Sequence, residues 1–318
     1  MTTLTANLLL LLAAAVWGFA FVAQRVGMAH MGPFTFNAIR FALGAVSLIP
    51  VIRATRSRQE HNASLGQVAL SGSVLGVVLF AAASAQQLGI MTTTAGKAGF
   101  ITGLYVVLVP LLALLWGERA SWLTWVGALL AVGGLYFLSG TRQVVLSTGD
   151  AWVLLSAFVF AIQIQLLAYL TQRVDPLPLA AAQFVVCSLL SWLVAGFAEP
   201  ITWSLLEGGL LPILYGGFMS VGLAYSLQAV AQRYARPTPA AIIMSFESPF
   251  AALGGWLLLG ERLGARGGIG AALMMAGMML AQAKPKGALV PTPDPANSSN
   301  SVDSPNLKKV PSVAEGAE

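Results

Sequence analysis

Long apolar runs, separated by short polar stretches, repeat along the first 283 residues of the chain. Each run holds about 20 residues, which is the length that an α-helix needs to cross the hydrocarbon core of a bilayer. The runs do not alternate with polar residues, as the strands of a transmembrane barrel do. The pattern predicts ten transmembrane helices, at residues 6–27, 34–52, 67–89, 93–115, 121–139, 150–170, 177–197, 209–232, 238–259 and 265–283.

The composition places these helices in lipid. Apolar residues make up 57% of the chain and charged residues 9%, whereas a soluble domain carries about 25% charged residues. The first helix is predicted to be retained and not cleaved as a signal peptide, because Met1–Asn7 contains no Lys or Arg and the apolar stretch continues through Phe21. The predicted fold class is therefore an all-α integral membrane protein.

The end of the chain differs sharply in composition from the rest. Residues 284–318 are rich in Pro, Ser, Asn and Lys and contain few large apolar residues. Such a segment has too little apolar surface to form a packed core. It is predicted to be a disordered cytoplasmic tail.

The basic residues give an orientation. If the N-terminus is cytoplasmic, the inner loops hold Arg53, Arg56, Arg58, Arg119, Arg173, Arg233 and Arg236, the tail adds Lys284, Lys286, Lys308 and Lys309, and the outer loops hold Arg142, Arg262 and Arg266. Since Lys and Arg accumulate in cytoplasmic loops, both termini are predicted to be cytoplasmic. The same bias accounts for the net charge of +5, so no nucleic-acid partner is expected.

The two halves of the chain match each other at a constant offset of 143 residues. Pro33 matches Pro176, Phe41 matches Phe184, Gly117-Glu118-Arg119 matches Gly260-Glu261-Arg262, and Gly127 and Gly134 match Gly270 and Gly277. The matches predict two five-helix repeats, at 6–139 and 150–283. Because five is odd, the second repeat enters the membrane from the opposite side. Inverted repeats of this kind build many secondary transporters, with the substrate near the bilayer midplane between the halves.

Three runs resemble the EamA-type branch of the drug/metabolite transporter superfamily. They are Trp17-Gly18-Phe19-Ala20-Phe21-Val22-Ala23, the stretch from Thr93-Thr94-Ala95-Gly96-Lys97 to Val109-Pro110, and Ser245-Phe246-Glu247-Ser248-Pro249 followed by Leu259-Gly260-Glu261. The resemblance covers residues 6–283. It implies a multi-pass metabolite carrier of the bacterial inner membrane, built from two five-helix repeats.

Arg25 and Arg40 also fall inside predicted helices, but two other charged residues there stand out. Lys97 lies about one turn inside the fourth, and Glu247 lies near the middle of the ninth. A charge at the bilayer centre costs about 2.5–3.5 kcal/mol on insertion scales, so each requires a reason. Their matches in the other repeat, Ala240 and Leu104, are apolar, so the symmetry is broken at both positions.

Each charge has a structural and a functional explanation. Lys97 either extends its side chain to the membrane surface or faces the interior. Glu247 either bonds to backbone groups freed by Pro249, which has no N–H to donate, or it binds a positive group or carries a proton. The depth of Glu247 favours the functional explanation.

These residues are predicted to line one central cavity, formed by Trp17, Lys97, Tyr105, Gln163, Tyr225 and Glu247. A zwitterion such as an amino acid suits this set, with Lys97 at its carboxylate and Glu247 at its ammonium group. If Glu247 acts alone, the substrate is a cation or the residue carries a proton. The uncharged members also have a structural alternative, as hydrogen-bonding partners between helices.

Other function classes find little support in the sequence. It contains one cysteine, Cys187, and two distant histidines, so neither a metal site nor another cofactor is expected. It lacks paired carboxylates and a phosphate-binding loop, which disfavours a membrane enzyme, and an apolar interior disfavours a channel. The prediction is a secondary transporter for a small metabolite such as an amino acid or related zwitterion. One version of this hypothesis is an exporter that is coupled to protons. The alternative is an exporter of cationic or drug-like compounds.

Overall fold

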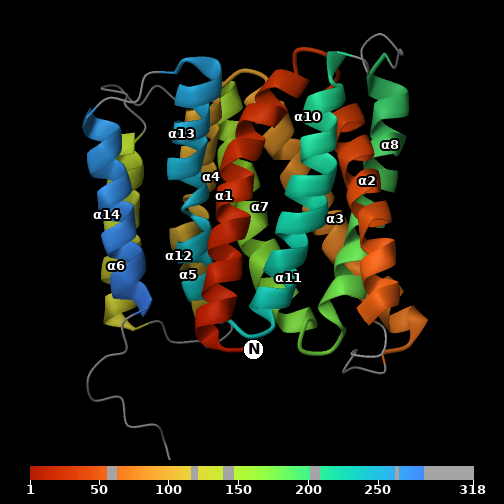
Figure 1. Ribbon diagram of the computed structural model, residues 1–318, viewed down its shortest axis with the longest axis horizontal. Coiled ribbons are helices and arrows are strands. Elements are labelled where there is room, and N and C mark those ends of the chain that lie inside the picture. Colours follow the sequence, from red (N-terminus) through yellow and green to blue (C-terminus); the bar gives the residue numbers. More distant parts are fainter. Residues whose placement is uncertain (56–62, 116–120, 139–146, 201–207, 262–264, 283–318) are drawn as a thin grey trace, which may run out of the picture. The chain divides into compact units, whose positions relative to one another are not determined.

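A computed structural model describes residues 1–55, 63–115, 121–138, 147–200, 208–261 and 265–282 (Figure 1). Every regular element in these ranges is helical. The elements are α1 (Thr3–Gly27), α2 (Pro33–Thr55), α3 (Leu65–Ile90), α4 (Ala95–Thr102), α5 (Tyr105–Leu115), α6 (Trp122–Leu138), α7 (Thr148–Leu170), α8 (Pro176–Ala198), α10 (Leu210–Leu214), the π-helix η2 (Tyr215–Tyr225), α11 (Ser226–Gln232), α12 (Pro237–Met244), α13 (Glu247–Leu259) and α14 (Ala265–Gln282). The predicted tail, the run Gly117-Glu118-Arg119 and Arg262 lie outside the described residues.

Eight spans in the described part of the chain are long and apolar enough to cross a membrane. They coincide closely with eight of the predicted helices, and three of them are composite: Ala95–Leu115, Leu210–Gln232 and Pro237–Leu259. The predicted helices 121–139 and 265–283 correspond to α6 and α14, which hold shorter apolar stretches. The multi-pass all-helical fold is thus confirmed, and the count of ten remains a prediction.

Polar side chains fix where several helices begin. Ser64 and Ser147 form capping boxes with Gln67 and Asp150, in which each side chain bonds the backbone N–H of the other residue. The first turn of α2 is capped from another helix, because the carboxylate of Glu199, just after α8, accepts from the backbone N–H groups of Phe34 and Thr35 at 2.8 Å each. A carboxylate at a helix N-terminus satisfies free N–H groups and complements the helix dipole.

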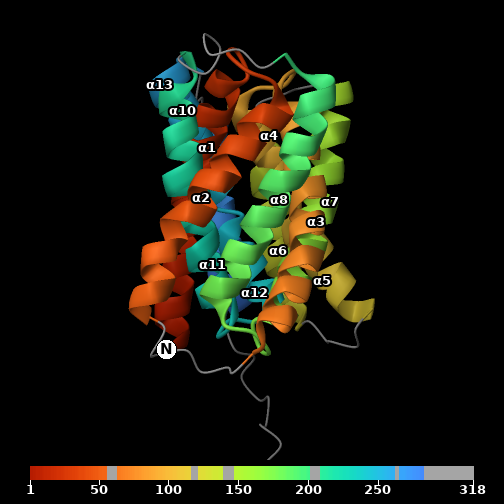
Figure 2. The same cartoon turned by 90° about the vertical axis from the view of Figure 1, so that its right-hand side faces the viewer.

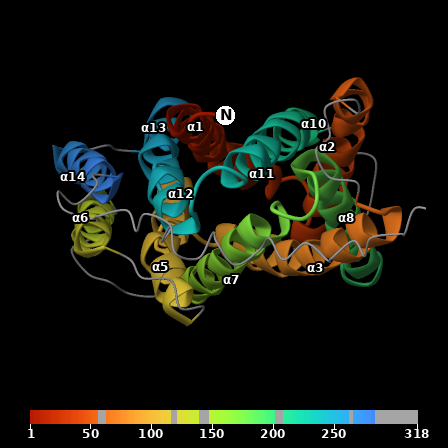
Figure 3. The same cartoon turned by 90° about the horizontal axis from the view of Figure 1, so that it is seen from below.

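The helix contacts stay the same when each helix is replaced by its match in the other predicted repeat. α1 packs against α12 and α13, as α7 packs against α4 and α5. α3 packs against α7, as η2 and α11 pack against α1. α2 pairs with α8, its own match (Figure 2). α6 pairs with α14, and these two stand together at one edge of the bundle (Figure 3).

The contact between α6 and α14 shows this symmetry of packing most clearly. A Cβ on Gly134 would lie 2.5 Å from the carbonyl oxygen of Gly270, and a Cβ on Gly277 would lie 2.5 Å from the carbonyl oxygen of Gly127. These four glycines are the ones that match at the offset of 143 residues. Since the end of each helix meets the start of the other, α6 and α14 run antiparallel, and they approach closely because glycine has no side chain.

Two helices are interrupted at matching positions. α4 ends at Thr102 and α12 ends next to Ser245, and these two residues are 143 apart in the sequence. At each break the backbone tightens, with Val106 N–H bonded to Gly103 O and Ser248 N–H bonded to Ser245 O, both at 3.1 Å. Pro249 lies in the first turn of α13, where its missing N–H is tolerated. The helix break therefore falls at the same position in each of the two predicted repeats.

We expect Gly76→Ala to lower the apparent melting temperature of the protein in detergent. A Cβ there would lie 2.6 Å from Val186 Cβ on α8, and overpacking of this kind costs about 1–3 kcal/mol. Gly196→Ala is the matched control, because a Cβ there meets no atom within 4 Å. An equal effect of the two substitutions on melting temperature would contradict the close α3–α8 packing.

Candidate functional site

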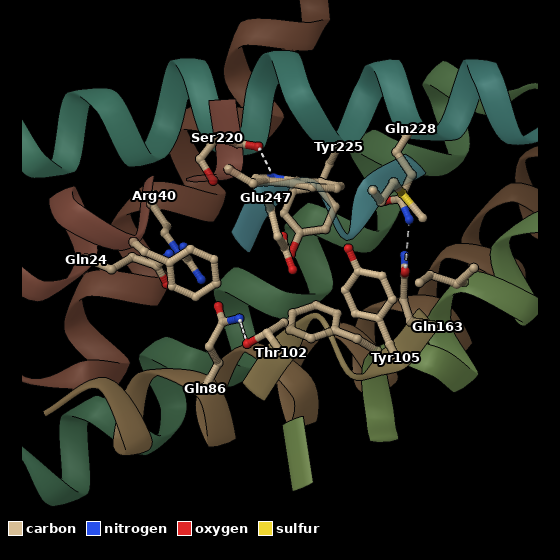
Figure 4. Close-up of a pocket in the computed structure, with 15 residues that line it drawn as sticks. Gln24, Arg40, Gln86, Thr102, Tyr105, Gln163, Ser220, Tyr225, Gln228 and Glu247 are labelled. Carbon is tan, nitrogen blue, oxygen red and sulfur yellow. Dashed lines mark hydrogen bonds between the residues drawn. The ribbon is translucent and has the colours of Figure 1, made fainter. Parts of the chain in front are cut away.

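A cavity lies at the centre of the bundle (Figure 4). Both predicted repeats contribute to its wall. The lining residues are Trp17, Phe21, Gln24, Arg40, Gln86, Thr102, Tyr105, Phe160, Gln163, Ile164, Ser220, Tyr225, Gln228, Met244 and Glu247. The cavity lies against both helix breaks, since Thr102 and Tyr105 flank one and Met244 and Glu247 flank the other.

Five of the six residues predicted for the site line this cavity: Trp17, Tyr105, Gln163, Tyr225 and Glu247. They come from five different helices, so the fold gathers side chains that are far apart in the sequence. Lys97 is the exception and does not line it.

Aromatic rings form one wall. The rings of Trp17 and Tyr225 meet edge to face with centroids 4.8 Å apart. The indole N–H of Trp17 donates to the carbonyl oxygen of Ser220 at 3.1 Å. Ser220 belongs to the π-helix η2, a type of helix that is frequent at functional sites. Behind Tyr225 stand Phe41 and Phe184, each about 6 Å from its ring centre.

The polar lining is only partly satisfied. The side-chain amide of Gln86 donates to the hydroxyl of Thr102 at 3.2 Å, and that of Gln228 donates to the side-chain oxygen of Gln163 at 3.4 Å. Six buried lining atoms have no hydrogen-bond partner among the described residues: Gln24 Oε1, Arg40 Nε, Tyr105 OH, Gln163 Nε2, Gln228 Oε1 and Glu247 Oε1. Buried polar atoms normally have partners, so this concentration in one cavity indicates a site that receives a polar ligand or water.

Glu247 carries the negative charge of the cavity. It is the first residue of α13, where the helix dipole favours a carboxylate, and it is 4% exposed. Figure 4 shows its carboxyl group directed toward the space that the hydroxyl of Tyr105 also faces. No ion pair involving Glu247 occurs in the described ranges.

Among the lining residues that the sequence prediction did not include, Arg40 is the charged one. It lies on α2, is 2% exposed, and its guanidinium carbon is 5.6 Å from the ring centre of Phe36 and 4.9 Å from that of Phe41. The signal was present, since Arg40 falls within the predicted helix 34–52. Its position in the sequence alone does not assign it a role.

Lys97 lies near one end of the bundle instead of in the cavity. Its Nζ is 2.6 Å from Asp150 Oδ2, and the carboxylate of Asp150 also accepts from the hydroxyl of Thr93 and the backbone N–H of Ser147. The side chain of Asp150 is fully buried and that of Lys97 is 29% exposed. This ion pair joins the N-terminal turns of α4 and α7.

A second, wider cavity of about 1450 Å³ lies toward the other end of α7. Its wall is formed by Ile162, Gln165, Leu166, Ala168, Tyr169 and Gln172 of α7 and by residues 232–237 between α11 and α12. Two hydrogen bonds from α11 to α7 lie between the cavities, those of Gln228 with Gln163 and of Gln232 with the carbonyl oxygen of Ile164. The two ends of α7 therefore differ, since one carries the ion pair with Lys97 and the other lines the wide cavity.

The described residues contain no group of three or more His, Cys, Asp and Glu side chains that could hold a metal ion. Cys187 is buried and unpaired. The central cavity presents one cation, one carboxyl group, amides, hydroxyls and aromatic faces to a ligand.

Comparison with known proteins identifies the same scaffold. The model of the EamA-like transporter family matches residues 4–140 and again 147–282. An "uncharacterized transporter" of Archaeoglobus fulgidus is 30% identical over 82% of this chain and 80% of its own length. A "probable terminal-alkyne amino-acid exporter" of Streptantibioticus cattleyicolor is 29% identical over 85% of this chain and 91% of its own. A protein of known crystal structure superposes with a TM-score of 0.72 at 20% identity, over 87% of this chain and 96% of the other.

We expect Lys97→Met to lower thermal stability without changing the KM for transported substrate, because Lys97 pairs with Asp150 outside the central cavity. Asp150→Asn should also destabilise the protein, since it removes the charge that pairs with Lys97 in the first turn of α7. The double variant tests the pairing, because its loss of stability should fall short of the sum of the two single losses. If the single substitution Lys97→Met raised the KM, Lys97 would instead belong to the substrate site.

Proposed function

Because this chain belongs to the EamA-like transporter family, we propose that it is a secondary transporter that carries a small metabolite across the cytoplasmic membrane by alternating access. The observation that carries this proposal is the central cavity, which is enclosed by both repeats and lined by buried polar atoms without partners. A midplane site at a repeat interface is the usual arrangement in transporters with inverted repeats. The two five-helix repeats, 6–139 and 150–283, are part of the proposal.

The proposed substrate is an amino acid or a related zwitterion. Glu247 suits an ammonium group, and the aromatic wall formed by Trp17 and Tyr225 suits a cation or an apolar side chain. The similar protein of Streptantibioticus cattleyicolor, a probable terminal-alkyne amino-acid exporter, supports the same class. Cationic or drug-like compounds form the second candidate class, in which Glu247 is the main recognition element.

The two ends of the bundle support a direction of opening. The wide cavity gives access from the end that holds the turn between α11 and α12, and the pair of Lys97 and Asp150 closes the opposite end. Exchange between the two states requires the hydrogen bonds from Gln228 and Gln232 to break and reform. In an exporter coupled to protons, Glu247 releases its proton to one side and receives substrate from the other.

Glu247→Gln is expected to abolish most transport while the protein folds normally, because the substitution keeps the shape of the side chain and removes the charge. Uptake or efflux in proteoliposomes, measured over a range of pH, is the assay. Glu261→Gln is the matched control at a carboxylate that does not line the cavity. Normal transport by Glu247→Gln across the pH range would show that the residue is structural.

A reporter fused to the C-terminus is expected to show a cytoplasmic location, as the distribution of Lys and Arg indicates. Alkaline phosphatase should be inactive and green fluorescent protein fluorescent at this site. The opposite result would require an odd number of crossings, or an outward N-terminus, and would overturn the proposed topology.

A further inference from the structure

Arg40 is a buried cation without an anion. Its Nε has no hydrogen-bond partner, and no ion pair of Arg40 occurs in the described part of the chain. A guanidinium group carries five N–H donors and remains charged in proteins. The faces of Phe36 and Phe41 give it partial compensation, but an unpaired charge in a low-dielectric interior still requires an anion or water.

Glu247 is the only carboxyl group that lines the same cavity, and it does not form an ion pair with Arg40 in the described ranges. Tyr225 lines the same cavity, with its ring centre 6.1 Å from that of Phe41, over which the guanidinium of Arg40 lies. Figure 4 shows the two charged groups entering the cavity from different helices, with aromatic rings around the space that they face. The cavity thus presents a positive and a negative group to one occupant.

Neither charge is needed to build the helix that carries it. The match of Arg40 in the other repeat is Gln183, which is also fully buried, and the match of Glu247 is Leu104. α8 and the break between α4 and α5 form without those charges. A role in binding explains why each repeat contributes one charge to the cavity, and why the two charges have opposite signs.

We propose that Arg40 binds the carboxylate of the substrate while Glu247 binds its ammonium group, so that the cavity selects molecules with both groups. This proposal rests on the proposed transport function and deepens it. The planar fork of Arg40 matches a carboxylate in bidentate geometry, and the unpaired atoms of Gln24 and Gln163 lie in the same lining to bond the remaining polar atoms. The substrate class is a small amino acid with a free amino group and a free carboxylate.

The first experiment measures transport by the wild-type protein in proteoliposomes. The probes are the common amino acids and, for each one that is carried, the amine that lacks its carboxylate and the acid that lacks its amino group. We expect the amino acid to be carried at least about 30-fold better than either analogue, because leaving one buried charge unpaired costs at least this much in binding. Carriage of the amine as well as the amino acid would overturn the role of Arg40 and leave the transport function standing. Transport of no probe, with cationic compounds included in the panel, would overturn the proposed function itself.

The second experiment separates binding from structure at Arg40. Arg40→Met should abolish stabilisation by the amino acid and raise the melting temperature of the empty protein, because it removes an unpaired buried charge. Arg25→Met is the control, since Arg25 donates to the carbonyl oxygens of Ile90 and Met91 and should lower the melting temperature instead. Arg40→Lys keeps the charge and loses the fork, so it should raise KM with little change in folding. An Arg40→Met protein that melts lower but keeps the wild-type KM would identify Arg40 as structural, and if Arg40→Met does not fold, an unchanged KM in Arg40→Lys overturns the proposal.

Discussion

In a lipid-embedded bundle, every polar atom must find its partner within the protein, and the rest of this structure depends on that constraint. Within each helix, backbone N–H and C=O groups hydrogen-bond to one another. Side chains such as Ser64, Ser147 and Glu199 accept from the N–H groups that helix ends leave free. Asp150 is satisfied by Lys97 and Thr93. The central cavity is where six lining atoms have no such partner, and this departure marks the place where an exchangeable partner belongs.

The scaffold and the site differ in symmetry. Packing pairs such as α6 with α14 and α2 with α8 are preserved when the repeats are exchanged, and the breaks at Thr102 and Ser245 occupy matching positions. The chemistry is not preserved, since Arg40 and Glu247 have no charged match and the π-helix η2 corresponds to a regular part of α3. Symmetry suits a framework that must adopt two related shapes, whereas a single substrate with two different ends requires an asymmetric site.

The apolar pattern was sufficient to predict most of the fold, because helix length and lipid contact depend on composition over many residues. It also identified Glu247 and Trp17, whose residue types are unusual at mid-span. It placed Lys97 at the cavity, whereas in the structure this side chain, near a helix end, bonds Asp150 of a neighbouring helix, and no spacing in the sequence brings Asp150 beside it. Arg40 was visible as a charge within a span, but its facing direction depends on how α2 packs against η2 and α8.

The cap that Glu199 places on α2 has a mechanical consequence. Its carboxylate holds the first turn of α2 from just beyond the end of α8, and Ser188 of α8 also donates to the carbonyl oxygen of Ala38. α2 is therefore fastened to α8, its counterpart in the other half of the sequence. The contact at Ala38 lies within one helical turn of Arg40. If the proposed transport cycle moves rigid bodies, this fastening predicts that α2 and α8 move together, so each body would contain helices from both predicted repeats.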